Sequence, residues 1–139
     1  MLLLFADQME KKNISFDENL DEVSVCYDED MLEIVWNNLL SNAIKFSSYG
    51  GNISVSLKTL TNTIKKYVVF SIADTGCGMD DATQKRIFDK FYQGDTSHSK
   101  NGNGLGLALV KKTIDLLGGT ITVDSKPEQG STFTLCLKI

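Results

Sequence analysis

Cysteine, proline and histidine are scarce in this chain, with three, one and one of them in 139 residues. Cys26, Cys77 and Cys136 are odd in number, widely spaced and outside any CxxC pattern. The sequence therefore predicts neither a structural zinc site nor a secreted disulfide framework. A chain of this length buries enough apolar surface to fold without such cross-links. We expect a reducing, cytoplasmic location.

The chain also lacks a long hydrophobic run, internal repeats and a dense basic stripe. The apolar start, residues 1–5, has no basic residue before it and is followed at once by Asp7, so it is too short for a signal peptide or a membrane span. We expect residues 1–11 to be the remnant of a linker or helix from a preceding domain. Neither nucleic-acid binding nor membrane contact is expected.

What is present fits one globular domain, expected at residues 12–139. Hydrophobic residues make up 42% of the chain and charged residues 23%. The formal net charge of −4 is unevenly spread, because residues 1–33 hold ten of the 18 acidic residues and only two of the 14 basic ones. The remainder is net positive. That surplus suits a site for a small polyanion, and an ordinary solvated surface is the alternative.

Hydrophobic periodicity predicts an α/β two-layer sandwich, in which a mixed sheet of about five strands has three helices on one face. Strands are expected around residues 14–16, 23–25, 53–57, 67–72, 120–124 and 132–139. Helices are expected from an N-cap at Asp28 to about Ser47, from Asp80 or Asp81 to about Phe91, and from Gly104 to Leu117.

Two short clusters, residues 74–79 and 102–107, hold five of the 11 glycines. Glycine lets a ligand approach the backbone closely, and amides at a helix N-terminus bind phosphate oxygens. The second cluster therefore predicts a phosphate-binding loop, with a flexible hinge before an ordinary helix as the alternative. It is neither a Walker A loop, which ends in Gly-Lys-Ser/Thr, nor a GxGxxG fingerprint, which needs glycine where Leu107 or Leu109 stands.

Asp74 ends the apolar run 68–73, so its carboxylate is expected half-buried at the carboxyl edge of a strand. There it can accept a hydrogen bond from an exocyclic amine such as adenine N6. The alternative is a cap on the following loop.

Asn38, Asn42 and Lys45 recur at i, i+4 and i+7 and so share one face of the first long helix. Asparagine is a poor helix former, so two on one face imply a function. Its side-chain oxygen suits magnesium, and the lysine suits phosphate as a point charge.

Four segments together resemble the motifs of the ATP-binding domain of sensor histidine kinases. Residues 38–46 resemble the N box, 74–79 the first glycine box, 86–92 the F box and 102–107 the second glycine box, in the same order as in that family. The resemblance covers the chain from about Lys12 to Ile139. It implies the Bergerat ATP-binding fold, which gyrase, the chaperone Hsp90 and the mismatch-repair protein MutL share.

The resemblance implies ATP and Mg²⁺ as cofactors. Asn42 would ligate the metal, Asp74 would bind the adenine amine, and Phe46 would pack on the base. Lys45, together with Arg86 or Lys90, would meet phosphates. The implied catalytic residues are Asn38, Asn42 and Lys45, and the implied nucleotide-binding residues are these three with Phe46, Asp74, Gly76, Gly78, Met79, Arg86, Lys90, Tyr92, Lys100, Gly102, Gly104, Leu105, Gly106, Leu107 and Thr132.

The implied function is to bind MgATP and present its γ-phosphate to a histidine on a separate dimerisation and phosphoacceptor domain, in two-component signal transduction with a response regulator. Asn38 stands where gyrase-like ATPases have a glutamate base, and an amide cannot take a proton. An ATP-hydrolysing clamp and a non-catalytic nucleotide-binding module are the alternatives. His98 is expected to be an ordinary loop residue.

Three further expectations concern the isolated chain. It should be a monomer. The loop 93–101, which has no apolar anchor, should be mobile and become ordered when a nucleotide binds. Cys77 should lie beside the adenine pocket, whereas Cys26 and Cys136, in apolar strand contexts, should be buried.

Overall fold

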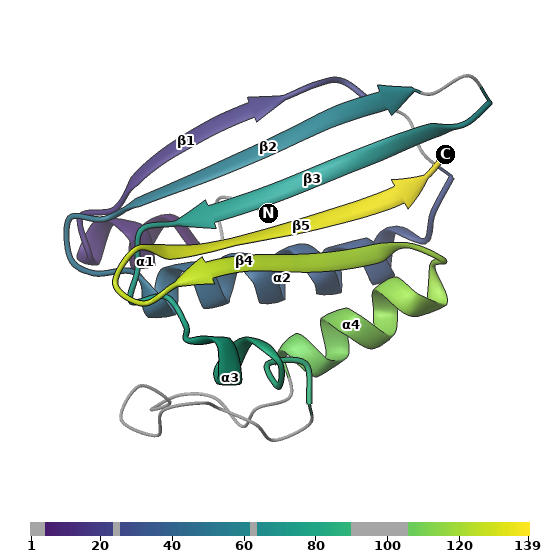
Figure 1. Ribbon diagram of the computed structural model, residues 1–139. Helices are drawn as coiled ribbons and strands as arrows, with labels where there is room; N and C mark the ends of the chain where they lie inside the picture. Colours follow the sequence, from purple (N-terminus) through teal and green to yellow (C-terminus); the bar gives the residue numbers. More distant parts are fainter. Residues whose placement is uncertain (1–4, 24–25, 62–63, 90–105) are drawn as a thin grey trace.

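The computed structural model describes residues 5–23, 26–61, 64–89 and 106–139, which form one five-stranded sheet with helices on one side (Figure 1). The strands are β1 (Ser15–Leu20), β2 (Asn52–Thr61), β3 (Lys66–Asp74), β4 (Thr120–Lys126) and β5 (Gly130–Lys138). Their order across the sheet is β1-β2-β3-β5-β4. β1 pairs with β2 in parallel and the other neighbours are antiparallel, so the sheet is mixed, as expected.

Two long helices, α2 (Glu29–Phe46) and α4 (Gly106–Leu116), form the second layer. Figure 1 shows both on the same side of the sheet, and the expected two-layer α/β sandwich is confirmed. α1 (Ala6–Lys11) and α3 (Asp81–Gln84) are short. Within the described ranges, no helix combines the length and the apolar character needed to cross a lipid bilayer.

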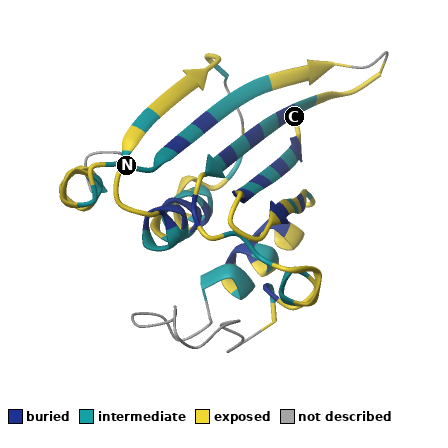
Figure 2. Cartoon of the chain, turned by 60° about the vertical axis from the view of Figure 1, so that its left-hand side comes forward, coloured by how far each residue is buried: buried dark blue, intermediate teal, exposed yellow. Residues whose placement is uncertain are grey.

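The hydrophobic core lies between the sheet and the two long helices. Asp28 caps α2 as expected, because its Oδ1 accepts hydrogen bonds from the amides of Asp30 at 2.9 Å and Met31 at 3.2 Å. From this start, apolar residues at helical spacing turn toward the sheet (Figure 2). The buried residues of α2 are Val35, Leu39, Leu40, Ala43 and Ile44. Each fully buried aliphatic side chain contributes roughly 1.5–3 kcal/mol.

The helix expected from Asp80 or Asp81 to about Phe91 is much shorter in the structure. α3 covers a single turn, and residues 85–88 form turns. The amide of Arg86 donates to the carbonyl of Thr83, three residues back, which tightens the chain. Ile87 and Phe88 both pack against the core. The amide of Lys85 still bonds to a carbonyl four residues back, whereas the amides of Arg86 and Asp89 bond to carbonyls three residues back, and this change of hydrogen-bond pattern ends the α-helix.

Two other expectations are wrong for the described residues. Val23 is not part of a strand, and residues 24–25 lie outside the described part of the chain. Cys26 is exposed, and Cys136 is only partly buried. The side chain of Cys136 alternates along β5 with those of Leu135 and Leu137, which are buried against the helices, so it faces the open side of the sheet.

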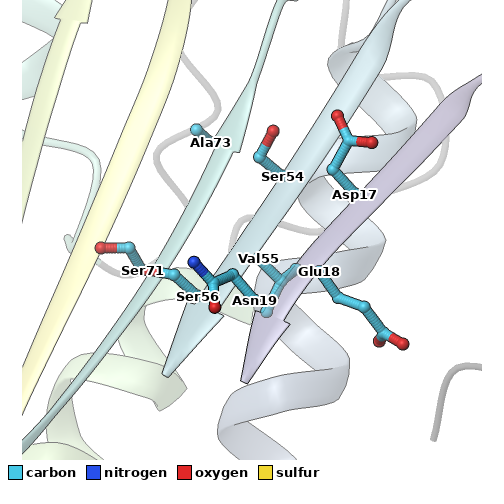
Figure 3. A pocket seen from close by; sticks show the side chains of 8 residues that line it. All are labelled: Asp17, Glu18, Asn19, Ser54, Val55, Ser56, Ser71 and Ala73. Atoms are coloured by element: carbon cyan, nitrogen blue, oxygen red, sulfur yellow. The ribbon is translucent and has the colours of Figure 1, made fainter. Parts of the chain in front are cut away.

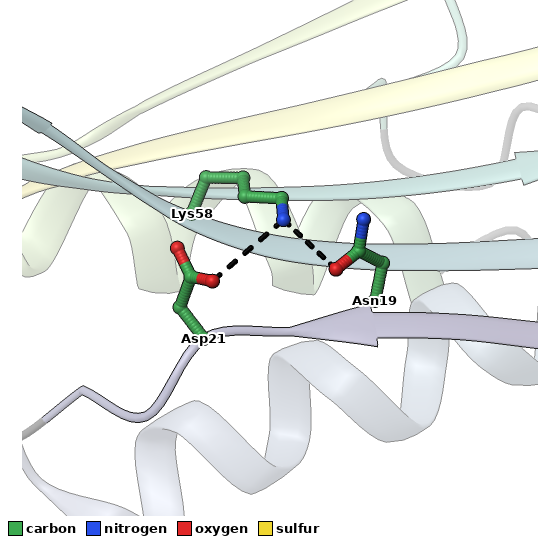
Figure 4. Close-up of polar contacts among 3 residues, drawn as sticks. All are labelled: Asn19, Asp21 and Lys58. Carbon is green, nitrogen blue, oxygen red and sulfur yellow. Dashed lines mark hydrogen bonds and ion pairs between the residues drawn. The ribbon is translucent and has the colours of Figure 1, made fainter.

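β1 forms an edge of the sheet, and most of its residues are exposed. Lys58 of β2 reaches toward this edge. Its Nζ donates to Asn19 Oδ1 at 2.8 Å and lies 3.6 Å from Asp21 Oδ1 (Figure 4). Both ion-pair side chains are 45% exposed, so the pair stabilises the fold by no more than about 1 kcal/mol. Charged residues along an edge also disfavour pairing with a strand of another molecule.

Replacing Leu39 by alanine should lower the free energy of unfolding by about 2–5 kcal/mol, because this core side chain is 1% exposed. Leu109 on α4 is 46% exposed, and the matched Leu109→Ala variant should change stability by less than about 0.5 kcal/mol. Urea denaturation followed by circular dichroism measures both. Similar losses in the two variants would contradict this placement of the core.

Candidate functional site

The flank of α2 next to α4 carries the asparagines that the sequence singled out. Asn38 and Asn42 are both half-buried. Asn38 Nδ2 donates to the carbonyl of Ile34 in the same helix at 2.7 Å. A Cβ added to Gly106 would lie 3.0 Å from Asn38 Oδ1, so the start of α4 approaches this oxygen closely. The structure therefore brings the end of the second glycine cluster beside Asn38.

Asp74 lies at the end of β3, where its Oδ1 accepts a hydrogen bond from the amide of Gly76 at 2.9 Å. Desolvation by burial raises the pKa of this carboxyl, and the amides of Gly76 and Ser131 partly oppose the rise. Because this carboxyl has a higher pKa in the folded than in the unfolded protein, it contributes to stability most fully below its ordinary pKa. That contribution to the free energy of unfolding is lost as the pH rises through the raised pKa of the folded state. A carboxyl whose pKa is shifted by burial and by nearby amides is common at binding sites.

The first glycine cluster holds Asp74 close to the end of α2. A Cβ on Gly76 would collide with the carbonyl of Phe46, the last residue of α2. The amide of Cys77 donates to that same carbonyl at 3.3 Å. Gly78 has a φ of +67°, and a Cβ there would collide with the carbonyl of Lys126. The loop therefore requires glycine at both positions, because any side chain there would collide with the backbone of α2 or of β4.

Two buried serines beneath this loop were missed in the sequence. Ser125 of β4 and Ser131 of β5 are 7% and 8% exposed, and their Oγ atoms are 2.7 Å apart. Ser125 Oγ accepts from the amide of Met79 at 2.8 Å and lies 3.0 Å from the carbonyl of Gly130. Gln84 of α3 donates to the carbonyls of Ser125 and Met79 at 2.8 and 3.1 Å. This cluster joins the loop, α3 and the last two strands.

Thr132, which the family resemblance places in the pocket, faces the other side of the sheet. Thr132 pairs with Ala73, whereas its neighbour Ser131 pairs with Asp74. Paired residues of an antiparallel sheet point to the same face, and consecutive residues point to opposite faces. Ser131 is therefore the β5 residue beside Asp74. A serine within a run of β-forming residues carries no signal that could have identified it.

The remaining described site residues occupy different surroundings. Lys45 and Phe46 are half-buried, and Lys45 Nζ lies 5.2 Å from the centre of the Phe46 ring. Leu107 packs against the core at the start of α4. Arg86 lies in the turn after α3, where its Nε is 3.3 Å from Asp89 Oδ2. Six expected residues lie outside the described residues: Lys90, Tyr92, Lys100, Gly102, Gly104 and Leu105.

A shallow hollow elsewhere belongs to the opposite face of the sheet. It lies over β1, β2 and β3, and Ser54, Ser71 and Ala73 are among the residues that line it (Figure 3). Ala73 and Asp74 are consecutive in β3, so their side chains point to opposite faces. The hollow is therefore separate from the residues gathered around Asp74.

The described site residues fit an adenine nucleotide with a divalent ion. Figure 1 shows the carboxyl end of β3, the C-terminal end of α2 and α3 at the same end of the sheet. Asp74 supplies a half-buried acceptor there, whereas Asn38 and Asn42 supply amide oxygens and Lys45 supplies an ammonium group. An acceptor suits an exocyclic amine, and neutral oxygens with a cation suit magnesium and phosphate.

The chain belongs to the family of histidine kinase-, DNA gyrase B- and HSP90-like ATPases, whose pattern it matches over residues 27–139. It is 41% identical to the heme sensor protein HssS of Staphylococcus saprophyticus over 128 residues, which cover 92% of this chain and 26% of HssS. The chain therefore spans about a quarter of that relative. Within the family, it is homologous to the ATP-binding catalytic domain of sensor histidine kinases.

Solved structures share the fold along nearly the whole chain. Full-length ShkA in complex with AMPPNP superposes with a TM-score of 0.82 at 28% identity, covering 97% of this chain and 27% of ShkA. The histidine kinase ThkA in complex with the response regulator protein TrrA superposes with a TM-score of 0.75 at 25% identity, covering 98% of this chain and 37% of ThkA.

Ser125→Ala should lower the free energy of unfolding by about 1–3 kcal/mol, because the amide of Met79 then loses its acceptor at a buried position. It should also speed amide exchange in residues 76–80. Thr122→Ala, at an exposed position of the same strand, is the control and should have little effect. Urea denaturation and hydrogen exchange test both, and unchanged exchange in Ser125→Ala would refute the role assigned to the serine pair.

Proposed function

We propose that this chain binds MgATP and presents the γ-phosphate to a histidine on a separate dimerisation and phosphoacceptor domain. The observation that carries the proposal is the half-buried carboxylate of Asp74, held by the amide of Gly76 at the end of the sheet where α2 ends. Family membership and the ShkA complex with AMPPNP support it.

Asp74 selects the base. Its carboxylate accepts a hydrogen bond from the N6 amine of adenine, and ionisation strengthens that bond. Guanine has a carbonyl oxygen at the corresponding position, which would oppose one acceptor to another. Phe46, at the end of α2, offers a half-buried ring against which the base packs.

The polar flank of α2 would bind the phosphate groups and their metal ion. Asn42 would hold Mg²⁺ through its side-chain oxygen, and Lys45 would meet a phosphate as a point charge. When bound, magnesium neutralises part of the negative charge on the phosphates. Gly106 and Leu107 lie at the start of α4, where free amides of a helix N-terminus suit phosphate oxygens.

The chemistry is transfer of a phosphoryl group. The bond from the γ-phosphorus to the β–γ bridging oxygen breaks, and a bond from that phosphorus to a ring nitrogen of histidine forms. ADP leaves, and the proton of the ring nitrogen passes to solvent. Catalysis of this step needs positioning and charge neutralisation more than covalent participation by the protein.

Asn38 distinguishes this proposal from an ATP-hydrolysing clamp. An amide side chain does not accept a proton from water, and Asn38 Nδ2 is engaged with the carbonyl of Ile34. A kinase module without a water-activating base holds ATP until the histidine arrives. ThkA, solved in complex with TrrA, supports a response regulator as the further partner of the parent protein.

Asp74→Asn should weaken ATP binding about tenfold, because a charge-assisted hydrogen bond contributes about 1.5–3 kcal/mol. The original chain should discriminate against GTP. Its affinity for adenosine should fall as the pH decreases through the raised pKa of Asp74, since protonation removes the charged acceptor. Calorimetry with adenosine avoids the titration of phosphate groups.

Asp74→Asn serves as the control for the pH series, because it has no carboxyl to titrate and its weaker adenosine binding should vary little with pH. Equal affinities of the original chain for ATP and GTP would refute the assignment of Asp74 to the base.

Asn42→Ala should abolish phosphoryl transfer from radiolabelled ATP to an added dimerisation domain of the parent protein, because the proposed metal ligand is gone. Ser41→Ala, at an exposed neighbouring position of α2, should transfer normally. Without the added domain the chain should neither label itself nor hydrolyse ATP appreciably. Acid-labile, base-stable label on His98 would show that the acceptor is not external.

A further inference from the structure

The C-terminal end of α2 is held by a lysine from far earlier in the chain. The last carbonyls of a helix have no donors within the helix. Lys12 Nζ donates to the carbonyls of Ile44 at 2.8 Å, Lys45 at 3.0 Å and Ser47 at 3.0 Å. An ammonium group has three donors, and here all of them are used on one helix end. Its positive charge also suits the negative end of the helix dipole.

The carbonyls of Ala43 and Phe46 accept hydrogen bonds from other donors, so each of the last four carbonyls of α2 has a partner. The carbonyl of Ala43 accepts from the amide of Ser47 at 3.1 Å and from its Oγ at 2.6 Å. The carbonyl of Phe46 accepts from the amide of Cys77 in the first glycine cluster. Lys12 and the glycine cluster therefore secure the same helix end through different carbonyls.

The backbone around Lys12 is fixed as well. Its carbonyl accepts from the amide of Gly50 at 2.8 Å, and the amide of Ser15 donates to the carbonyl of Gly51 at 2.9 Å. The turn that follows α2 is thus bonded to the segment that leads into β1. These backbone bonds fix the position of the Lys12 Cα atom. From there the partly buried lysine side chain reaches the end of α2.

We propose that Lys12 is a positioning residue of the nucleotide site, an inference that rests on the proposed function. It touches no substrate and acts through the last two turns of α2, which carry Asn42, Lys45 and Phe46. Without its ammonium group, the carbonyls of residues 44, 45 and 47 lose a donor and the helix end frays. Asn42, Lys45 and Phe46, which are proposed to contact magnesium, phosphate and base, then no longer keep the relative positions that binding requires.

The test compares Lys12→Met with three variants of the full chain. Lys11→Met removes the same charge from an exposed neighbouring position. Ile121→Val weakens the core within β4 and shows what a loss of stability alone does to binding. Lys12→Arg keeps a cation with several donors. Calorimetry gives the affinity for MgADP at a temperature at which circular dichroism shows every variant folded, and hydrogen exchange follows residues 43–51.

Lys12→Met should weaken MgADP binding at least fivefold and speed exchange in residues 43–51, whereas Lys11→Met and Ile121→Val should stay within twofold of the original chain. Lys12→Arg should recover most of the lost affinity. If Lys12→Met binds within twofold of Lys11→Met, the positioning role is wrong and the proposed function still stands. If the original chain itself does not bind MgADP, the proposed function fails, and unchanged exchange in Lys12→Met would separately refute the cap.

Discussion

Packing of α2 on the sheet is the interaction on which the candidate site depends. Val35, Leu39 and Ala43 lie on the flank that is buried in the core. Asn38 lies on the adjoining flank beside the start of α4, and Asn42 follows one helical turn later on the same flank. Because an α-helix is stiff over this length, burial of one flank decides where the other points. The apolar contacts, worth several kcal/mol together, orient polar side chains that by themselves contribute little to folding.

A second constraint operates where α2 ends. The first glycine cluster lies so close to the carbonyl of Phe46 that no side chain fits at Gly76. The same turn supplies the amide that hydrogen-bonds Asp74. Burial disfavours the ionised carboxylate, and the amides of Gly76 and Ser131 offset part of that cost. The glycine thus serves helix packing and electrostatics at once, so the contacts within the protein suffice to explain it.

The proposed function, in which this chain holds the nucleotide and another domain supplies the histidine, agrees with these constraints. A site that only positions a nucleotide needs rigid elements and fixed charges, whereas hydrolysis also needs a base that activates water. The flank of α2 presents amides and an ammonium group, and Asn38 is engaged with its own helix. In the proposed function, the nucleophile is a histidine supplied by a separate domain, so the chain itself needs no residue that activates a nucleophile.

Local signals made much of the fold predictable. The Asp28 cap, the helical periodicity of α2 and the alternation along the strands all depend on near neighbours in the chain, and each appears in the structure. The predicted length of α3 was wrong, since the helix ends after one turn and the turns that follow it place Ile87 and Phe88 against the core. Local propensity is weak, and tertiary contacts readily override it.

The sequence by itself determined the fold class and the family, and it predicted the residue types of the candidate site, because glycine clusters and helical spacing are visible without coordinates. Only the tertiary structure decided which residues meet. Ser131, and not Thr132, lies beside Asp74, because strand pairing alone sets which face a residue occupies. Ser125 and Lys12 reach the site region from distant segments by hydrogen bonds. Such contacts leave no pattern in the sequence, since a bond between residues tens of positions apart depends on how the whole chain folds.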